Sequence, residues 1–265
     1  MKNKLHRMTW KEVRDAFATD PVIVIPMGSM EVHGPHSIVG DYYAAEVIAD
    51  RASELTGAYT VPIAPFGCSE YFRDFPGTIS VRPATLINWL RDVTDCLFEH
   101  GITKILFLNG HAGNAYPVEC LCREIRREKR ILTGRLDIWQ MIPADVKKEV
   151  YGDKINKVGH GGGPVDTVMK YLVPDEMRMD LIEEEELLQQ WEQFPAKGLG
   201  KTEICGMPSF LPFNMADLSK QGSLGDPYIA DAEGGKKIVD ALVDVTASYI
   251  RLMQQSDMHL DKPQV

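Results

Sequence analysis

The chain has 265 residues, of which 44% are hydrophobic and 25% charged, a composition typical of a soluble globular protein with a sizeable core. Its formal net charge of −9 argues against a nucleic-acid-binding protein, which usually carries a basic face. The five cysteines are irregularly spaced and no apolar signal or membrane-spanning run is present, so we expect a reduced, cytoplasmic protein.

Short apolar strands and amphipathic helices are predicted to alternate through the first half of the chain. Thr9 and Glu12 have the spacing of a capping box at the start of a short helix over 9–18. The run PVIVI at 21–25 is short, β-branched and continuously apolar, as in a strand covered on both faces. The other elements expected in this half are helices over 44–55, 85–101 and 116–130 and strands over 59–66, 103–110 and 134–141.

This alternation is typical of a three-layer α/β/α domain with a mainly parallel sheet, and we expect one such domain over residues 1–265. In the second half, a helix is expected over 164–173. A solvated helix is expected over 181–191, which contains four consecutive glutamates. The stretch 192–230, rich in glycine and proline, is expected to be loop, and a closing amphipathic helix is expected over 231–255.

Metal-ligand side chains follow two of the predicted strands at the point where each strand ends. Because ligands of parallel α/β sheets bind beyond the carboxyl ends of the strands, these two loops are expected to meet if their strands are neighbours. Carboxylates and imidazoles suit zinc, manganese or iron(II), and a cation removes the repulsion between clustered carboxylates. His36 is left open between metal ligand and substrate contact. The candidates in the two loops are Glu31, His33, His36, Asp41, Asn109, His111 and Asn114.

His160 opens a third candidate segment, in which three glycines and then Asp166 follow. A histidine on a glycine-rich loop is mobile and accessible, which suits a general acid or base near neutral pH. The competing interpretation is a loop that needs glycine only for its turns. A structural zinc site usually contains cysteine, and the candidate residues include none, so the pattern favours an open, catalytic centre.

Several segments taken together resemble the creatininase, or creatinine amidohydrolase, family. The resemblance extends over most of the chain and implies an α/β/α fold, metal-dependent hydrolysis and assembly into homohexamers. It also implies that Glu31, Asp41 and His111 hold one ion. The segments that carry it are PMGSMEVHGPH at 26–36, FPGTIS at 75–80, NGHAGN at 109–114, HGGG at 160–163 and GDPYIADAEGGKKI at 225–238.

The resemblance further implies a second ion, held by His33 and another carboxylate, with Asp41 bridging the two ions. Asp166, after a one-residue insertion, takes the place of the family's glutamate and is expected to be a metal ligand. His160 is expected to pass a proton to the leaving group. One or two ions per chain are expected, with Zn²⁺ the first choice and Mn²⁺ or Fe²⁺ the alternatives.

Two departures from the family pattern bear on the substrate. Creatinine-hydrolysing members have His-Tyr-Glu where this chain has His111, Ala112 and Gly113. Phe72 stands where a histidine often precedes FPGT. The chain is therefore expected to be a family member with a substrate other than creatinine.

The expected activity is the opening of a small cyclic substrate by attack of metal-bound hydroxide on a carbonyl carbon. A cyclic amide cleaved at its C–N bond is the first choice. The alternatives are C–C cleavage of a cyclic diketone such as a dehydro-inosose, and a non-catalytic, metal-stabilised binding protein. A phosphoesterase is disfavoured because the motif loops carry almost no basic residues. Besides His36 and Asn114, the expected substrate-binding residues are Tyr42, Tyr71 and Arg73.

Overall fold

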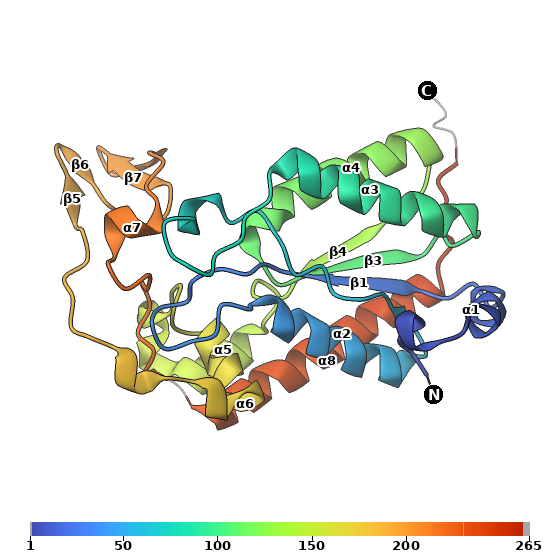
Figure 1. Ribbon diagram of the computed structural model, residues 1–265, viewed down its shortest axis with the longest axis horizontal. Helices are drawn as coiled ribbons and strands as arrows, with labels where there is room; N and C mark the ends of the chain where they lie inside the picture. The colour runs from blue at the N-terminus through green and yellow to red at the C-terminus, as the bar shows by residue number, and fades with distance from the viewer. Residues whose placement is uncertain (1, 230, 262–265) are drawn as a thin grey trace.

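A four-stranded parallel sheet forms the centre of the computed structural model, which describes residues 2–229 and 231–261 (Figure 1). β1 and β3 are direct neighbours, with Met27 opposite Asn109 at the ends of the two strands. The chain segments that leave these strands therefore start side by side. In sheet order, the strands are β2 (Tyr59–Thr60), β1 (Ile23–Met27), β3 (Ile105–Asn109) and β4 (Gly134–Asp137).

Helices cover both faces of this sheet, which gives the predicted three layers (Figure 1). Because side chains alternate along a strand, β1 sends Ile23 and Ile25 to one core and Val24 to the other. The first core is completed by α3 (Pro83–Glu99) and α4 (Ala115–Lys129). The second core is completed chiefly by α2 (Tyr42–Thr56), α5 (Ala144–Tyr151), α6 (Val165–Leu172) and α8 (Ala232–Gln254).

Local signals set the ends of several helices, and the predicted capping box is one of them. Thr9 and Glu12 form a capping box at the start of α1 (Trp10–Phe17). α2 ends at Gly57, whose φ of 76° is a left-handed conformation that glycine adopts without strain. The side chain of Asp231 caps α8 by accepting a hydrogen bond from the Gly234 amide. Several 3-10 turns lie between the main elements: η1 (Leu5–Arg7), η2 (Glu70–Phe72), η3 (Ala112–Asn114), η4 (Gly152–Lys157), η5 (Pro174–Glu176) and η6 (Met179–Leu181).

The strand expected over 59–66 is shorter than predicted. Only Tyr59–Thr60 pair continuously with β1, followed by an isolated pairing between Ala64 and Met27. Pro62 and Pro65 lack amide hydrogens, so this stretch cannot continue a regular ladder of hydrogen bonds. The segment still runs beside β1 and brings the following loop to the same sheet edge.

The helix expected over 181–191 is wrong, and the stretch expected as loop contains strands. Residues 182–189 run without helix, and the Glu185 carboxylate accepts hydrogen bonds from the Ser219 hydroxyl at 2.6 Å and the Lys220 amide at 2.7 Å. These contacts satisfy the carboxylate outside a helix. The hairpins and the short helix that follow are β5 (Gln190–Trp191) with β6 (Phe194–Pro195), β7 (Lys201–Ile204) with β8 (Met207–Phe210), and α7 (Met215–Leu218).

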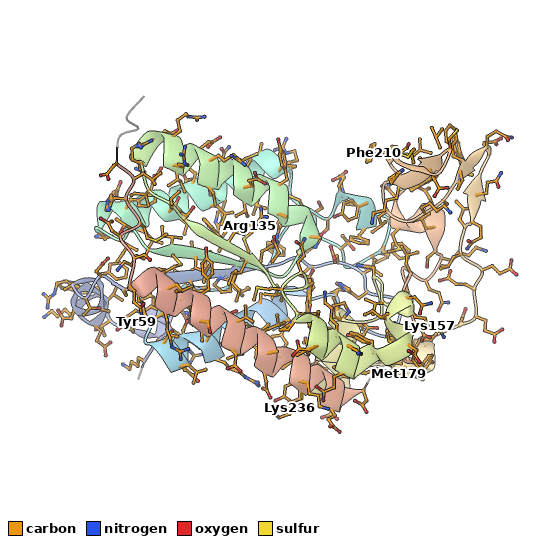
Figure 2. The ribbon with its side chains drawn as sticks, turned by 180° about the vertical axis from the view of Figure 1, so that it is seen from behind. Tyr59, Arg135, Lys157, Met179, Phe210 and Lys236 are labelled. Atoms are coloured by element: carbon orange, nitrogen blue, oxygen red, sulfur yellow. The ribbon has the colours of Figure 1, made fainter. Side chains whose placement is uncertain are left out.

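The two hairpins stand at one end of the molecule, away from the central sheet (Figure 1). Figure 2 shows Phe210 at this end and Tyr59 of β2 toward the other. None of the described helices combines the length and the apolar character that crossing a membrane requires. The expectation of a single domain over residues 1–265 extends past the described ranges at both ends.

Candidate metal centre

Three predicted ligands meet where β1 and β3 end. Glu31 and Asp41 lie on the loop that leaves β1, and His111 lies two residues beyond β3. All three side chains are buried, and ligand atoms of the three lie within 4.8 Å of one another. A main-chain hydrogen bond of 2.8 Å from the Gly110 amide to the Met27 carbonyl joins the two strand ends. The neighbouring strand order thus produces the convergence that the sequence predicted.

The His111 ring is oriented by the main chain. Its Nε2 lies 3.0 Å from the Cys68 carbonyl oxygen, so this nitrogen donates its hydrogen there. Its Nδ1 lies 3.0 Å from Glu31 Oε2 and 3.3 Å from Asp41 Oδ2. A histidine whose distal N–H is fixed on a carbonyl presents its other nitrogen to a metal ion. The arrangement therefore needs a proton or a cation between Nδ1 and the two carboxylates.

The electrostatics of this group reflect two buried acids beside one imidazole. Burial alone would raise the pKa of Glu31, but the charge and hydrogen bond of His111, with smaller contributions from His33 and His160, together lower it to about 2. Burial and the Glu31 charge together raise the pKa of Asp41 to about 7. Burial opposes the charge on His111, but Glu31 and Asp41 outweigh it and raise the His111 pKa well above its ordinary value. A divalent cation relieves this crowding of negative charge.

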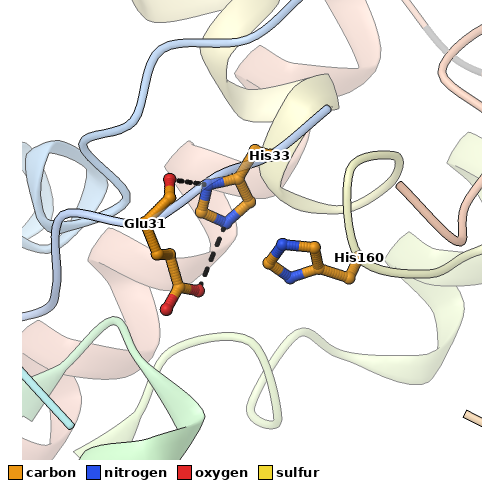
Figure 3. Close-up of side chains that lie close together, drawn as sticks. All are labelled: Glu31, His33 and His160. Carbon is orange, nitrogen blue, oxygen red and sulfur yellow. Dashed lines mark hydrogen bonds and ion pairs between the residues drawn. The ribbon is translucent and has the colours of Figure 1, made fainter. Parts of the chain in front are cut away.

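A second group of ligand atoms within 4.8 Å of one another comes from Glu31, His33 and His160 (Figure 3). His33 Nδ1 donates to the Glu31 carbonyl oxygen at 3.1 Å, and its Nε2 lies 3.6 Å from Glu31 Oε1. The His160 ring stacks on the His33 ring with centroids 4.4 Å apart. Burial lowers the pKa of His33 to about 3 and also lowers the pKa of His160. Both imidazoles are therefore neutral near pH 7, the state in which histidine binds metals.

The donor set of the two groups fits a divalent metal. It consists of two carboxylates and three imidazoles, all held by parts of the fold that pack around the end of β1 and β3. Oxygen and imidazole donors of this kind suit Zn²⁺, Mn²⁺ or Fe²⁺. Glu31 belongs to both groups and so lies at their junction.

Asp166 lies outside both groups of close ligand atoms, and its expected role as a ligand of a second ion stays a prediction. Its Oδ2 is in contact with His36 Nε2, and both side chains are buried. The pair joins α6 to the loop that follows β1, because Asp166 is in the first turn of α6. His36, expected as a metal ligand or substrate contact, is likewise engaged by this partner.

The Asn114 side chain, expected to contact substrate, forms hydrogen bonds to neighbouring loops. It is fully buried, and its Oδ1 accepts from the Cys68 amide at 2.9 Å. Its Nδ2 donates to the Gly28 carbonyl at 3.0 Å and lies 3.3 Å from Asn109 Oδ1. These bonds hold together the loops after β1, after β2 and after β3. Asn109 has a similar role, since its Nδ2 donates to Asp137 Oδ1 at 2.8 Å.

The other expected substrate contacts differ in their position. Tyr71 is partly buried, stands edge-on to Phe72 with ring centroids 4.8 Å apart, and has its pKa raised by burial. Tyr42 is partly buried at the start of α2. Arg73 lies at the surface, where its guanidinium is 3.1 Å from the Glu70 carboxylate and its side chain is 62% exposed. The charges of His111, Glu31 and Asp41 also act on the pKa of Tyr71.

Three residues that shape the centre, Ser29, Ser69 and Phe72, were not among the site residues predicted from the sequence. The Ser69 hydroxyl donates to Glu31 Oε2 at 2.6 Å, and the Ser29 amide donates to Asp41 Oδ1 at 2.6 Å. Phe72 stacks on the His160 ring with centroids 4.2 Å apart. A serine or phenylalanine in a loop has no distinctive spacing. The only signal available was the family resemblance, because Ser29 lies within PMGSMEVHGPH and Ser69 and Phe72 lie shortly before FPGTIS.

The sequence is similar to a known protein family and to several characterised enzymes. The family model described as "Creatininase: Creatinine amidohydrolase" matches residues 6–250. A creatinine amidohydrolase of Pseudomonas putida is 26% identical over 92% of this chain and 94% of its own length. A mycofactocin precursor peptide peptidase of Mycobacterium tuberculosis is 29% identical over 91% of this chain and 89% of its own. A 3-dehydro-scyllo-inosose hydrolase of Thermotoga maritima is 31% identical over 39% of this chain and 34% of its own.

Solved structures agree with the sequence comparison at the level of the fold. A structure titled "Creatininase Mn" superposes with a TM-score of 0.76 and 22% identity, covering 95% of this chain and 98% of that one. A mutant creatininase of "Zn-Zn type" gives the same TM-score and coverage. With a family model that matches nearly the whole chain, these findings show that the protein belongs to the creatininase family.

Proposed function

We propose that this protein is a metal-dependent hydrolase that cleaves an amide C–N bond, with a small cyclic amide as the substrate class. The observation that carries the proposal is the position of His111 Nδ1, 3.0 and 3.3 Å from two buried carboxylate oxygens. An imidazole nitrogen and two carboxylate oxygens that converge at this spacing are the kind of ligand set that binds a divalent metal ion. Membership of the creatininase family supports hydrolysis as the reaction.

The residues of the centre have two roles, to bind the metal ion and to orient its ligands. Glu31, Asp41 and His111 would hold a divalent cation, which supplies Lewis-acid activation of water and of a carbonyl group. Ser69 fixes the Glu31 carboxylate and the Ser29 amide fixes that of Asp41, so both acids are held in place before an ion binds. Such preorganisation matters because charge that develops in the transition state is then stabilised without rearrangement.

An amide substrate is favoured by the relatives that span this chain. Two relatives that cover about nine-tenths of it are named a creatinine amidohydrolase and a mycofactocin precursor peptide peptidase. Creatinine itself is disfavoured because Gly113 occupies the position of the glutamate in creatinine-hydrolysing members. A Cβ built at Gly113 would lie 2.1 Å from the Cys68 carbonyl oxygen, so the backbone here leaves no room for that side chain.

Hydrolysis of a C–C bond in a cyclic ketone is the second candidate. One observation supports it, the 31% identity to a 3-dehydro-scyllo-inosose hydrolase over 39% of the chain. In that reaction the departing atom is a carbon stabilised by a neighbouring ketone. The metal-binding groups would be the same, and only the bond cleaved would differ.

The family resemblance assigns proton transfer to the leaving atom to His160. In support, this side chain lies beside Glu31 and His33 and is the only partly exposed residue among the members of the two ligand groups. Assembly into homohexamers rests on the same resemblance, whereas a cytoplasmic location rests on the number and irregular spacing of the cysteines. Sedimentation of the purified protein tests the hexamer directly.

Metal analysis joined to a substrate screen tests the proposed function. The purified protein should contain Zn²⁺, Mn²⁺ or Fe²⁺ and should open members of a panel of small lactams, with dipeptides and cyclic polyol ketones as the other arms. His111→Ala should lose both metal and turnover, while His259→Ala, at an exposed histidine, should keep both. A His111→Ala variant with unchanged metal content and turnover would contradict the proposal. Turnover of the ketones alone would select the second candidate.

A further inference from the structure

We propose that the two hairpins at one end of the molecule form a contact between two copies of this chain that are related by a two-fold axis. The hairpins are β5–β6 and β7–β8, and together with the residues that join them they make up a hairpin arm over residues 190–213. The family resemblance implies a homohexamer without saying which surfaces meet. The inference names the surface and the symmetry of one contact, and it does not depend on which bond the protein hydrolyses.

The hairpin arm exposes large apolar side chains of the kind that soluble proteins usually bury. Trp191 and Phe210 expose 51% and 77% of their surface, and Ile204 and Met207 expose 54% and 67%. A buried aromatic side chain covers about 150–250 Å², so the two aromatic residues together present roughly 200–300 Å² to solvent. Exposed apolar surface of a few hundred Å² commonly marks an interaction site.

The β7–β8 ribbon exposes apolar side chains on both of its faces. Because side chains alternate along a strand, the paired residues Ile204 and Met207 lie on one face and Phe210 lies on the other. A two-stranded ribbon is only marginally stable by itself in water. This ribbon is held where Thr202 is buried and its hydroxyl donates to the Pro195 carbonyl at 2.8 Å. Among the described residues, no further layer covers the exposed side chains, so a partner is needed to bury them.

The charges of the hairpin arm favour a second copy of this chain as that partner. The whole chain has a formal net charge of −9, so two copies repel each other over most of their surface. The arm is different, because its two acids are balanced by two lysines. These residues are Glu192, Glu203, Lys197 and Lys201. Two copies can therefore approach each other through the arm without net repulsion.

One acid and one lysine of the hairpin arm are left for a partner. Lys197 lies 3.9 Å from Glu203 in the same arm, whereas neither Glu192 nor Lys201 forms an ion pair with another described residue. Both side chains are exposed. In a two-fold contact, residue i of one copy meets residue j of the other, and j meets i. An arm that offers both members of an ion pair is self-complementary, and a two-fold contact would form this pair twice.

The apolar and the charged groups of the hairpin arm occupy the same two places. Phe210 pairs with Lys201 across the β7–β8 ribbon, and Trp191 directly precedes Glu192. A cavity of about 310 Å³ lies beside Trp191 and Phe213 and offers a recess for an aromatic side chain of the partner. A stable interface buries about 800 Å² on each side, with aromatic anchors at its centre and charges at its rim. The arm supplies both parts of such an interface.

The hairpin arm is fixed to the body of the protein at its base. Leu199, between β6 and β7, packs against a small apolar cluster that contains Phe72 and Met215. Phe210 stands at the end of the molecule, away from the central sheet (Figures 1 and 2). Because the exposed side chains are remote from the ends of β1 and β3, loss of the contact should leave the metal content of the protein unchanged.

The test is the mass of the assembly, measured by sedimentation velocity over a range of protein concentrations. A two-fold contact pairs the copies, so the wild-type protein should contain an even number of them. Phe210→Ser removes an exposed anchor that the fold of one chain does not need. It should raise the dissociation constant of this contact about 30-fold, so that the mass falls to half that of the wild type. Circular dichroism and metal analysis should match the wild type.

The charge pair is tested by reversal and rescue. Lys201→Glu would bring two like charges together in each pair, and it should weaken the contact about 10-fold. Glu192→Lys alone should do the same. The double variant, with Lys201→Glu and Glu192→Lys, re-forms both pairs in the opposite sense and should restore the wild-type mass. Lys11→Glu makes the same charge change on α1, at the other end of the molecule, and should keep the wild-type mass (Figure 1).

Each outcome decides a definite part of the inference. A wild-type protein that is a monomer, or that contains an odd number of copies, would overturn it. Wild-type mass in Phe210→Ser would overturn the assignment of the hairpin arm. Wild-type mass in Lys201→Glu, or a double variant that is not restored, would overturn the two-fold pairing. All of these results leave the proposed function standing, since metal content and turnover decide that separately.

Discussion

The His111 imidazole and the Cys68 main-chain carbonyl are joined by a hydrogen bond of 3.0 Å, which turns the other ring nitrogen of His111 toward Glu31 and Asp41. Cys68 thus takes part through its backbone, and burial raises the pKa of its thiol. The ring is positioned by the loop that follows β2, whereas the carboxylates come from the loop after β1. The geometry of the centre therefore depends on how these loops are tied to one another.

Removing the metal should lower the melting temperature of the protein. Without a cation the carboxylates of Glu31 and Asp41 are buried side by side, and their repulsion contributes to the raised pKa of Asp41. A ligand that binds only the folded state, at a concentration about 1,000 times its Kd, stabilises that state by about 4 kcal/mol. Calorimetry before and after treatment with EDTA, and again after adding Zn²⁺ back, measures the effect. The His111→Ala variant should respond far less to Zn²⁺, and an equal response would contradict the assignment of the first group.

Metal binding to the metal-free protein should become tighter as the pH rises through about 7. Asp41 has its pKa raised to about 7 and His111 has its pKa raised well above the ordinary value, so below these values both hold protons that an ion must displace. At higher pH fewer protons compete with the metal ion for these groups, so the metal affinity rises. Titration calorimetry in two buffers of different ionisation enthalpy should show proton release on binding. An affinity that is the same at about pH 6 and about pH 8 would contradict this prediction.

Ser69→Ala should weaken metal binding while leaving the fold in place. The hydroxyl donates to Glu31 Oε2 at 2.6 Å, and partners that orient a ligand in this way typically contribute 10–100-fold in metal affinity. We therefore expect an affinity loss of about 10–100-fold, measured by competition with a chromophoric chelator. Ser209→Ala, at a serine in the β7–β8 hairpin, is the matched control and should bind metal like the wild type.

Gly113→Ala should lower both stability and metal affinity. The added methyl would meet the Cys68 carbonyl and the His111 ring, and forcing extra volume into packed structure typically costs about 1–3 kcal/mol. Gly101→Ala is the control, because its φ of 81° also opposes a side chain but nothing lies within 4 Å of the new methyl. Both variants should be less stable in urea, but only Gly113→Ala should lose metal affinity. Equal metal binding in the two would show that Gly113 has no part in holding His111.

Much of the centre was predictable because it follows from strand order. The runs that form β1 and β3 are recognisable from their apolar residues, and the ligand types directly after them indicated one shared edge. Glu31, Asp41 and His111 meet there because the two strands are parallel neighbours. Sequence periodicity cannot give the order of strands in a sheet. The prediction that the two loops meet therefore depended on β1 and β3 being neighbours, which only the structure shows.

The parts that escaped prediction depend on contacts between distant segments. Asp166 pairs with His36 across 130 residues of sequence, and no local spacing reports such a contact. The glutamate-rich stretch has the composition of a helix, but Glu185 instead binds the Ser219 hydroxyl and the Lys220 amide. Tertiary hydrogen bonds of this kind override the intrinsic preference of a segment for helix.

The burial of Glu31, His33, Asp41 and His111 limits what can reach them. Each of these side chains exposes no more than 3% of its surface, while His160 and Tyr71 are partly open. A folded macromolecule is too bulky to bring a bond to so enclosed a point. For the proposed hydrolysis we therefore expect a slender substrate, either a free metabolite-sized ring or the loose end of a peptide, and we expect it to enter beside His160 and Tyr71, which are partly exposed.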